Sequence, residues 1–180
     1  STRKESSAAS DVYKRQTLAS HLRGTDIFMD MVSDSQYVKE LVNYCAEVSI
    51  AMSKMYIDAG MDVIAVVDPL VSQVSPKHIE KMLSEGFTAV FDYIRSRGAF
   101  SSFFVCGNAT KQIEVMCKMG PDGVSVDENL ILPEAKKVSD KYNIVMGGNI
   151  PLTTTMLHGN QEDNMIVVKF FENVHRSKPF

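Results

Sequence analysis

Polar and sulfur-bearing side chains recur at four points of the sequence, each directly after a short apolar run. A carboxylate follows the first run, a thiol and an amide the second, two neighbouring carboxylates the third, and an amide the fourth. Carboxylates can transfer protons and amides can hydrogen-bond to substrates, so these groups could act on a small molecule if the fold gathered them. We predict Asp127 and Glu128 as catalytic residues, and Asp68, Asn108 and Asn149 as substrate-binding residues.

Each of these residues also has an ordinary structural interpretation. Asp68 precedes a proline and could cap a loop. Asn108 and Asn149 could close turns, because an asparagine side chain can mimic a backbone hydrogen bond. The paired carboxylates could face solvent, and Cys106 could be a small buried side chain. The prediction of a site therefore depends on the residues lying together, not on any one of them.

The hydrophobic pattern between these points alternates between helices and strands. Apolar residues within 34–59 recur with helical spacing, and Gly60 suits the left-handed residue that ends a helix. Residues 61–67 form a β-branched run typical of a strand buried on both faces. At Ser75, a serine cap followed by proline indicates the start of a helix that extends to Gly98.

The same unit recurs toward the C-terminus. The expected strands are residues 101–105, 123–126 and 144–146, and the expected helices are residues 110–119 and 133–142. Thr17 and Leu18 could end a further strand. Strands that alternate with helices of this length predict right-handed βαβ units and a parallel sheet. Functional groups of such sheets gather beyond the carboxyl ends of the strands, so the polar residues would share one edge.

Size and composition suit one globular domain. The chain has 180 residues, of which 44% are hydrophobic, and a formal net charge of −3. This mild acidity gives no reason to expect nucleic acid or an anionic membrane as a partner. No apolar run approaches the ~20 residues of a membrane-spanning helix. The three cysteines form no disulfide framework, which favours a reducing, cytoplasmic location. The sequence does not indicate an oligomeric state.

Both ends differ from the region between them. Residues 1–15 are rich in Ser, Lys and Arg and have no hydrophobic period, which predicts a disordered or non-native tail. Residues 165–180 begin as an apolar stretch and finish in a polar run that closes no domain, as expected of a truncated or non-native segment. We therefore expect the domain to span residues 16–164.

An ordered series of motifs in this domain resembles the uroporphyrinogen decarboxylase superfamily, which includes the methylcobamide:coenzyme M and related corrinoid-dependent methyltransferases. The main motifs are residues 104–110 (Phe-Val-Cys-Gly-Asn-Ala-Thr) and 123–128 (Gly-Val-Ser-Val-Asp-Glu). Supporting stretches, in family order, are residues 17–24, 59–64 and 148–152. The resemblance runs from about residue 17 to residue 164. It implies an α/β fold that is about the second half of a (β/α)8 TIM barrel, without the first strands and the final strand.

The resemblance implies that the parent protein moves a methyl group to a thiol or corrinoid acceptor. The methyltransferases of this superfamily hold zinc with a His-x-Cys pair and a later cysteine, and the zinc activates a substrate thiol. Cys106 matches the first cysteine, Phe104 stands at the histidine position, and no cysteine follows Cys117. Cys106 is therefore predicted as a metal ligand. Zinc in the full-length protein, a methylcobamide as substrate and a corrinoid protein as partner follow from the same resemblance.

Two other functions stay open at this point. One is uroporphyrinogen decarboxylation in porphyrin biosynthesis, for which His21 stands where the decarboxylases have an active-site tyrosine and is predicted to bind substrate. Gripping the carboxylates of a tetrapyrrole would need clustered arginines, and the barrel part offers Arg23, Arg95 and Arg97. The other is an inactive fragment, because an open set of strands leaves unpaired edges.

Overall fold

One sheet of five parallel strands organises the molecule. The computed structural model describes residues 10–12, 15–148 and 150–176. Each strand pairs with the next one in sequence, in the order β1-β2-β3-β4-β5. The strands are β1 (Ser10–Val12), β2 (Val63–Val67), β3 (Phe100–Val105), β4 (Gly123–Val126) and β5 (Val145–Gly147). The predicted α/β architecture with parallel strands is confirmed.

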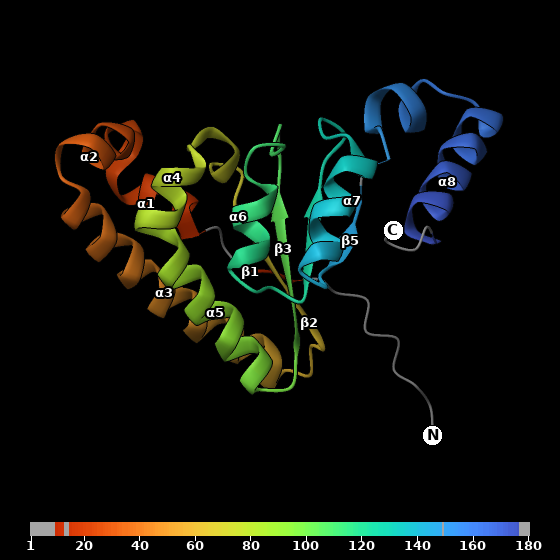
Figure 1. Ribbon diagram of the computed structural model, residues 1–180. Coiled ribbons are helices and arrows are strands. Elements are labelled where there is room, and N and C mark those ends of the chain that lie inside the picture. Colours follow the sequence, from red (N-terminus) through yellow and green to blue (C-terminus); the bar gives the residue numbers. More distant parts are fainter. Residues whose placement is uncertain (1–9, 13–14, 149, 177–180) are drawn as a thin grey trace.

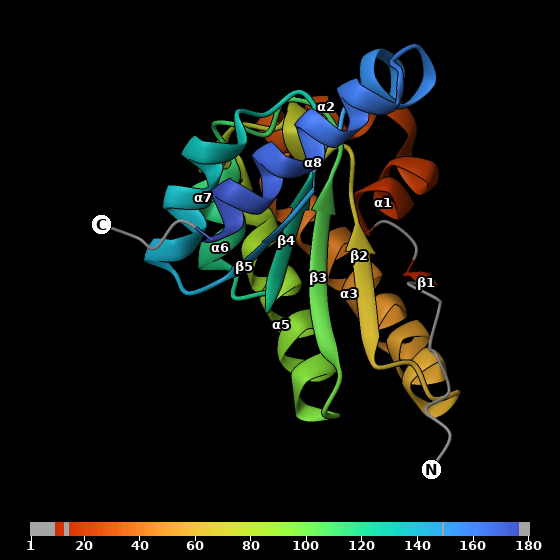
Figure 2. The same cartoon turned by 90° about the vertical axis from the view of Figure 1, so that its right-hand side faces the viewer.

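Helices connect the strands and form a layer on one face of the sheet (Figure 1). Figure 2, turned by 90°, shows β2 to β5 in front of α3, α5, α6 and α7. The α-helices are α1 (Arg15–Arg23), α2 (Ile27–Ser33), α3 (Ser35–Asp58), α4 (Pro76–His78), α5 (Ser84–Ser96), α6 (Ile113–Lys118), α7 (Leu132–Lys141) and α8 (Gln161–Arg176). Short 3-10 turns lie at Gly24–Asp26 and Val71–Gln73, and π-helical turns at Ile79–Leu83 and Leu152–Leu157.

The hydrophobic core lies between the sheet and this layer of helices. Side chains alternate across a strand, and one set, which includes Ile64, Phe103 and Val124, is fully buried. The ring of Phe103 packs against Phe87 and Phe91 of α5, with centroid distances of 4.8 and 5.4 Å. Aromatic pairs at such distances stabilise a core beyond the effect of burial alone.

The other face of the sheet carries the alternate residues of the same strands. On this face Val63, Phe100 and Val145 are 40%, 39% and 61% exposed. In a closed (β/α)8 barrel, this face lines the interior and is packed with side chains. This face is turned toward the viewer in Figure 2, where α8 crosses in front of its upper part and the lower part is left open by the described residues.

Local signals in the sequence set the starts of two helices. The Asp34 carboxylate accepts a hydrogen bond from the N–H of Tyr37 at 3.0 Å and so caps α3. The Ser75 hydroxyl accepts one from the N–H of His78 at 3.3 Å and caps α4, as predicted. The helix expected from Ser75 to Gly98 contains a π-helical turn, which its periodicity did not indicate.

The prediction of a strand end at Thr17 and Leu18 is wrong, because both residues lie in α1. Ala19 of this helix is fully buried, and Leu18 packs partly against the core. These two apolar residues therefore belong to the buried side of a helix. The strand beside β2 is instead β1, in which Ser10 pairs with Ile64. This strand falls within the predicted tail, whose residues 1–9 and 13–14 lie outside the described part.

The C-terminal helix α8 joins the core through Phe171 and Val174, while Met165 and Ile166 are 50% and 60% exposed. It covers most of the segment 165–180, of which residues 177–180 are not described. Within the described ranges, no helix is both long and apolar enough to cross a bilayer.

Candidate functional site

The carboxyl ends of β2, β3 and β4 bring the predicted site residues to one edge of the sheet, at the top of Figure 1. Asp68 directly follows β2 and is fully buried, whereas Cys106 and Asp127 directly follow β3 and β4 and are half-buried. Asn108 and Glu128 lie one or two residues further on and are exposed. Because the strands are parallel and paired in order, these residues form a continuous rim along three neighbouring strand ends, and we refer to them as the rim.

Asp127 uses both carboxylate oxygens at the rim. Its Oδ2 accepts a hydrogen bond from the N–H of Gly107, in the loop that follows β3. Its Oδ1 accepts bonds from the N–H and side-chain amide of Asn129, at 2.9 and 3.1 Å. Asp127 therefore connects its own loop to the loop that carries Cys106.

Glu128 connects the loop after β4 to the segment after β5, on the side away from Cys106. Its Oε2 accepts a hydrogen bond from the N–H of Leu152 at 2.6 Å, at the start of the π-helical turn that follows β5. The two neighbouring carboxylates thus link the loops after β3, β4 and β5. The sequence indicated a pair of acids at a strand end, but not that each would hold a different neighbouring loop.

Asp68 is bound into the loop after β2. Its N–H donates to the carbonyl of Phe104 at 3.0 Å, and its Oδ1 accepts from the N–H of Leu70 at 3.0 Å. The loop is held further by Gln112, a buried residue whose Nε2 donates to the carbonyls of Ser72 and Val74 at 3.2 and 2.9 Å. Sequence reasoning missed Gln112, because a glutamine inside a predicted helix gives no signal that its side chain reaches another loop.

The remaining predicted site residues behave differently. The Oδ1 of Asn108 accepts from the N–H and hydroxyl of Thr110 at 3.1 and 2.7 Å, which is the turn-forming role considered from the sequence. His21 is exposed near the end of α1, not at a strand end. Asn149 lies outside the described residues.

The three cysteines occupy different environments. Cys45 and Cys117 are buried in α3 and α6, and burial, helped by Glu114, raises the pKa of Cys117 to about 12. Its thiol therefore stays protonated and unreactive at neutral pH. Cys106 is half-buried at the rim, where a small molecule could reach it.

The described residues do not assemble a metal centre. Protein-bound zinc takes three or four nitrogen, oxygen or sulfur ligands. Nowhere in the described ranges do three His, Cys, Asp or Glu side chains come together for an ion. Phe104, which cannot bind a metal, stands where the resemblance places a histidine. Cys106 would therefore need ligands from outside the described residues to bind zinc.

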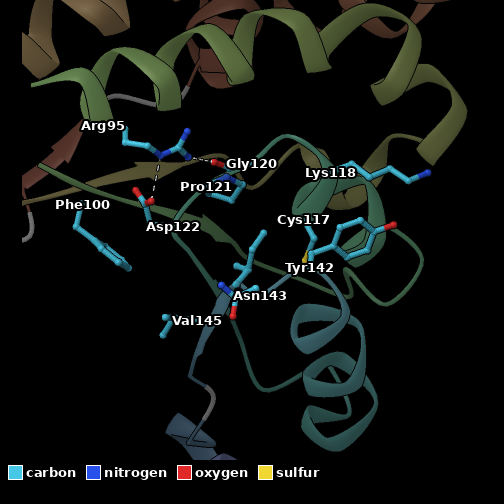
Figure 3. A pocket seen from close by; sticks show the side chains of 11 residues that line it. Arg95, Phe100, Cys117, Lys118, Gly120, Pro121, Asp122, Tyr142, Asn143 and Val145 are labelled. Carbon is cyan, nitrogen blue, oxygen red and sulfur yellow. Dashed lines mark hydrogen bonds and ion pairs between the residues drawn. The ribbon is translucent and has the colours of Figure 1, made fainter. Parts of the chain in front are cut away.

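A concavity of about 560 Å³ lies at the opposite ends of β3 to β5 (Figure 3). Two charged residues of its wall are already paired: Arg95 contacts the Asp122 carboxylate at 3.3 Å and donates to the carbonyl of Gly120. Phe100 and Val145 in its wall belong to the open face of the sheet. Strand starts in barrels of this kind serve stability, so the rim is the better candidate site.

Asp122 holds together the starts of β3 and β4. Its Oδ2 accepts from the N–H and hydroxyl of Ser101 at 2.8 and 2.7 Å. Partial burial acts to raise the pKa of Asp122, but the bonds from Ser101 and the charge of Arg95 together outweigh it. The pKa of this carboxyl is therefore lowered from its ordinary value of 3.8. Asp122 thus stabilises the fold when it is ionised.

We expect Asp122→Asn to lower the free energy of unfolding by about 1 kcal/mol at pH 7, because it removes the charge from this hydrogen-bonded group. A lowered folded-state pKa means that the contribution is complete above the ordinary value of 3.8 and is lost as the pH falls below it. Urea unfolding at several pH values should therefore show the difference from wild type shrinking in acid. Asp92→Asn, which alters an exposed partner of the same Arg95, should change little at any pH.

Comparisons with known proteins agree with this fold. A sequence model described as "Uroporphyrinogen decarboxylase (URO-D)" matches residues 16–169. Methylcobamide:CoM methyltransferase MtbA of Methanosarcina acetivorans is 26% identical over 150 residues, which cover 82% of this chain and 43% of that protein. MtaA of Methanosarcina barkeri is 29% identical over 148 residues, which cover 79% and 42%. The chain thus spans less than half the length of these relatives.

A solved structure described as a methyltransferase from Methanosarcina mazei superposes with a TM-score of 0.81 at 22% identity. The match covers 89% of this chain and 48% of that one. This likeness confirms the fold predicted from the sequence, a partial (β/α)8 barrel in which parallel strands alternate with helices. The open face of the sheet is the face that such a barrel turns toward its interior.

Proposed function

This chain belongs to the uroporphyrinogen decarboxylase family, and we propose that the complete protein is a corrinoid-dependent methyltransferase that moves a methyl group from a methylcobamide to a thiol. Curated relatives named as methylcobamide:CoM methyltransferases support this choice within the family. The observation that carries it furthest is the position of Cys106, a half-buried thiol at the strand-end edge where α/β barrels do their chemistry.

In the proposed reaction, the sulfur of a substrate thiolate forms a bond to the methyl carbon of the methylcobamide. The cobalt–carbon bond breaks, its electron pair stays on the metal, and Co(III) becomes Co(I), while the thiol proton passes to solvent. We propose that both substrates meet at the rim beside Cys106. Asp68 and Gln112 would hold one wall of that site, and Asn108 could contact substrate through its amide NH2 group, since its Oδ1 is bound to Thr110.

The alternative reaction of the family, decarboxylation of a tetrapyrrole, would need arginines at the rim. Arg95 and Arg97 lie beyond the other end of the sheet, where they pair with Asp122 and Asp58. Arg23, the last residue of α1, pairs with Asp30 of α2. Arg95 and Arg97 are thus held away from the rim and Arg23 is bound by Asp30, which favours methyl transfer. A small thiol and a corrinoid protein are the partners that we propose.

The test is to mix the complete protein with methylcobalamin and small thiols under anaerobic conditions. We expect demethylation of the cobalamin that depends on the thiol, with cob(I)alamin and an S-methyl thioether formed in equal amounts. Reactions without thiol or without protein are the controls. Turnover of uroporphyrinogen together with no demethylation of methylcobalamin would overturn the proposal in favour of the decarboxylase reaction.

A further inference from the structure

We propose that Asp127 is a positioning residue that fixes the turn carrying Cys106, and that it does not itself take part in proton transfer. Only the effect on turnover depends on the proposed function. The effect on the Cys106 thiol follows from the geometry of the rim alone.

The backbone ladder between β3 and β4 ends just below this point, with Val105 paired to Val126. Beyond that pair, the chain turns at Gly107, whose φ is +83°. The carboxylate of Asp127 binds the N–H of Gly107 and so continues the link between the two strands where the ladder has ended. A charged acceptor makes a stronger bond to a backbone N–H than a neutral carbonyl does. Cys106, between Val105 and Gly107, is therefore held from both sides.

The turn is also confined from the side of β2. A Cβ atom added to Gly107 would lie 2.9 Å from the Oγ of Ser72, so this turn and the loop after β2 are in close contact. Ser72 is in turn fixed through its carbonyl, which accepts a bond from Gln112 at 3.2 Å. Asp127 thus supplies a restraint on the turn besides the contact with Ser72, and its hydrogen bond can be removed by a substitution that leaves the backbone unchanged.

The remaining contacts of Asp127 favour a holding role. Three N–H bonds, from Gly107, from the backbone of Asn129 and from its side chain, converge on its two oxygens. A carboxylate occupied in this way is a poor proton acceptor for a substrate, since it would have to give up bonds that stabilise its charged form.

The chain offers a matched control in Asp122, which joins the same two strands at their other ends. Its carboxylate also binds a backbone N–H of β3, that of Ser101, at 2.8 Å. Asp122→Ala and Asp127→Ala therefore remove the same kind of bond from the same pair of strands, and only one of the two bonds lies beside Cys106. A general loss of stability would affect both variants alike.

The experiment uses the complete protein and measures two quantities in each variant. The first is the rate at which iodoacetamide alkylates Cys106, followed by mass spectrometry of the peptide that contains it. The second is kcat and KM for transfer from methylcobalamin to a small thiol. We expect Asp127→Ala to change the alkylation rate of Cys106 and to lower kcat, each by about tenfold or more. An effect of this size corresponds to the loss of one charge-assisted hydrogen bond. Asp127→Asn keeps an oxygen acceptor for Gly107 but turns its NH2 group toward the N–H donors of Asn129, so it should recover only part of both, and Asp122→Ala should match wild type in both.

The outcomes separate the inference from the proposed function. If no variant or wild type transfers methyl groups but Asp127→Ala still alters Cys106 alkylation, the positioning role stands and the proposed function fails. If wild type transfers methyl groups and Asp127→Ala leaves the alkylation rate unchanged, the positioning role is overturned. Equal changes in Asp122→Ala and Asp127→Ala would likewise overturn it, because they would show a general loss of structure.

Discussion

Replacement of Phe103 by alanine is expected to lower the free energy of unfolding by about 3–5 kcal/mol, the usual cost of removing a large buried aromatic side chain. Phe103 is fully buried in β3, and its ring contacts Phe87 and Phe91, which are fully buried as well. The cavity would open at the centre of the contact between sheet and helices, where neighbouring rings cannot easily close it. Urea unfolding followed by circular dichroism measures the effect.

Two variants serve as controls for Phe103. Phe103→Leu keeps an apolar side chain in the same place and should cost about 1 kcal/mol. Phe100→Ala lies on the same strand but on the open face, where the side chain is 39% exposed, and should cost clearly less than Phe103→Ala. If Phe100→Ala were as damaging as Phe103→Ala, the assignment of the two faces of β3 would be contradicted.

Gly148→Ala is expected to lower the free energy of unfolding by about 2–4 kcal/mol, because it combines two unfavourable terms. Gly148 has a φ of +106°, a conformation that L-residues with a side chain rarely adopt. An added Cβ would also collide with the carbonyl oxygen of Val126, a backbone atom of β4 that cannot move without disturbing the ladder. The same variant should disturb the loop after β5 and lower methyl transfer.

Gly60→Ala separates the effect of the positive φ from the effect of the steric contact. Gly60 has a similar φ of +93°, but no atom lies within 4 Å of the added Cβ. We expect it to cost about 1 kcal/mol, the contribution of backbone strain alone. Thermal unfolding of both variants would compare them directly. Equal effects of the two substitutions would show that the close approach of Gly148 to β4 is not a constraint.

Much of the fold could be predicted because its signals are local. The cap at Ser75 and the alternating run at 123–126 placed elements within a few residues of their observed bounds. The strand end predicted at Thr17 and Leu18 was wrong because no local signal marks the structure there. Two residues show no readable period, and the packing of α1, with Leu18 against the core, depends on contacts with α3 that are distant in sequence.

The site could be predicted only as a location. That Asp68, Cys106 and Asp127 would share an edge followed from parallel topology, which places every strand end on the same side. Which group each carboxylate binds depends on the conformation of the loops. The spacing of residue types in the sequence does not indicate that conformation. The bond from Gly107 to Asp127 and the bonds from Gln112 to the loop after β2 are therefore findings of the structure. The chemical roles of Asp127, Glu128 and His21 stay predictions.

The most direct test of a methyl-transfer site at the rim uses the complete protein carrying Cys106→Ala. Its rate of thiol-dependent methylcobalamin demethylation is measured, with Cys117→Ala as the control. We expect Cys106→Ala to lower kcat about a hundredfold or more, on the scale of losing a group that acts in the reaction centre. Cys117→Ala, which removes a buried and protonated thiol, should stay close to wild type. Demethylation at the wild-type rate by Cys106→Ala would contradict the placement of the reaction at this edge of the barrel.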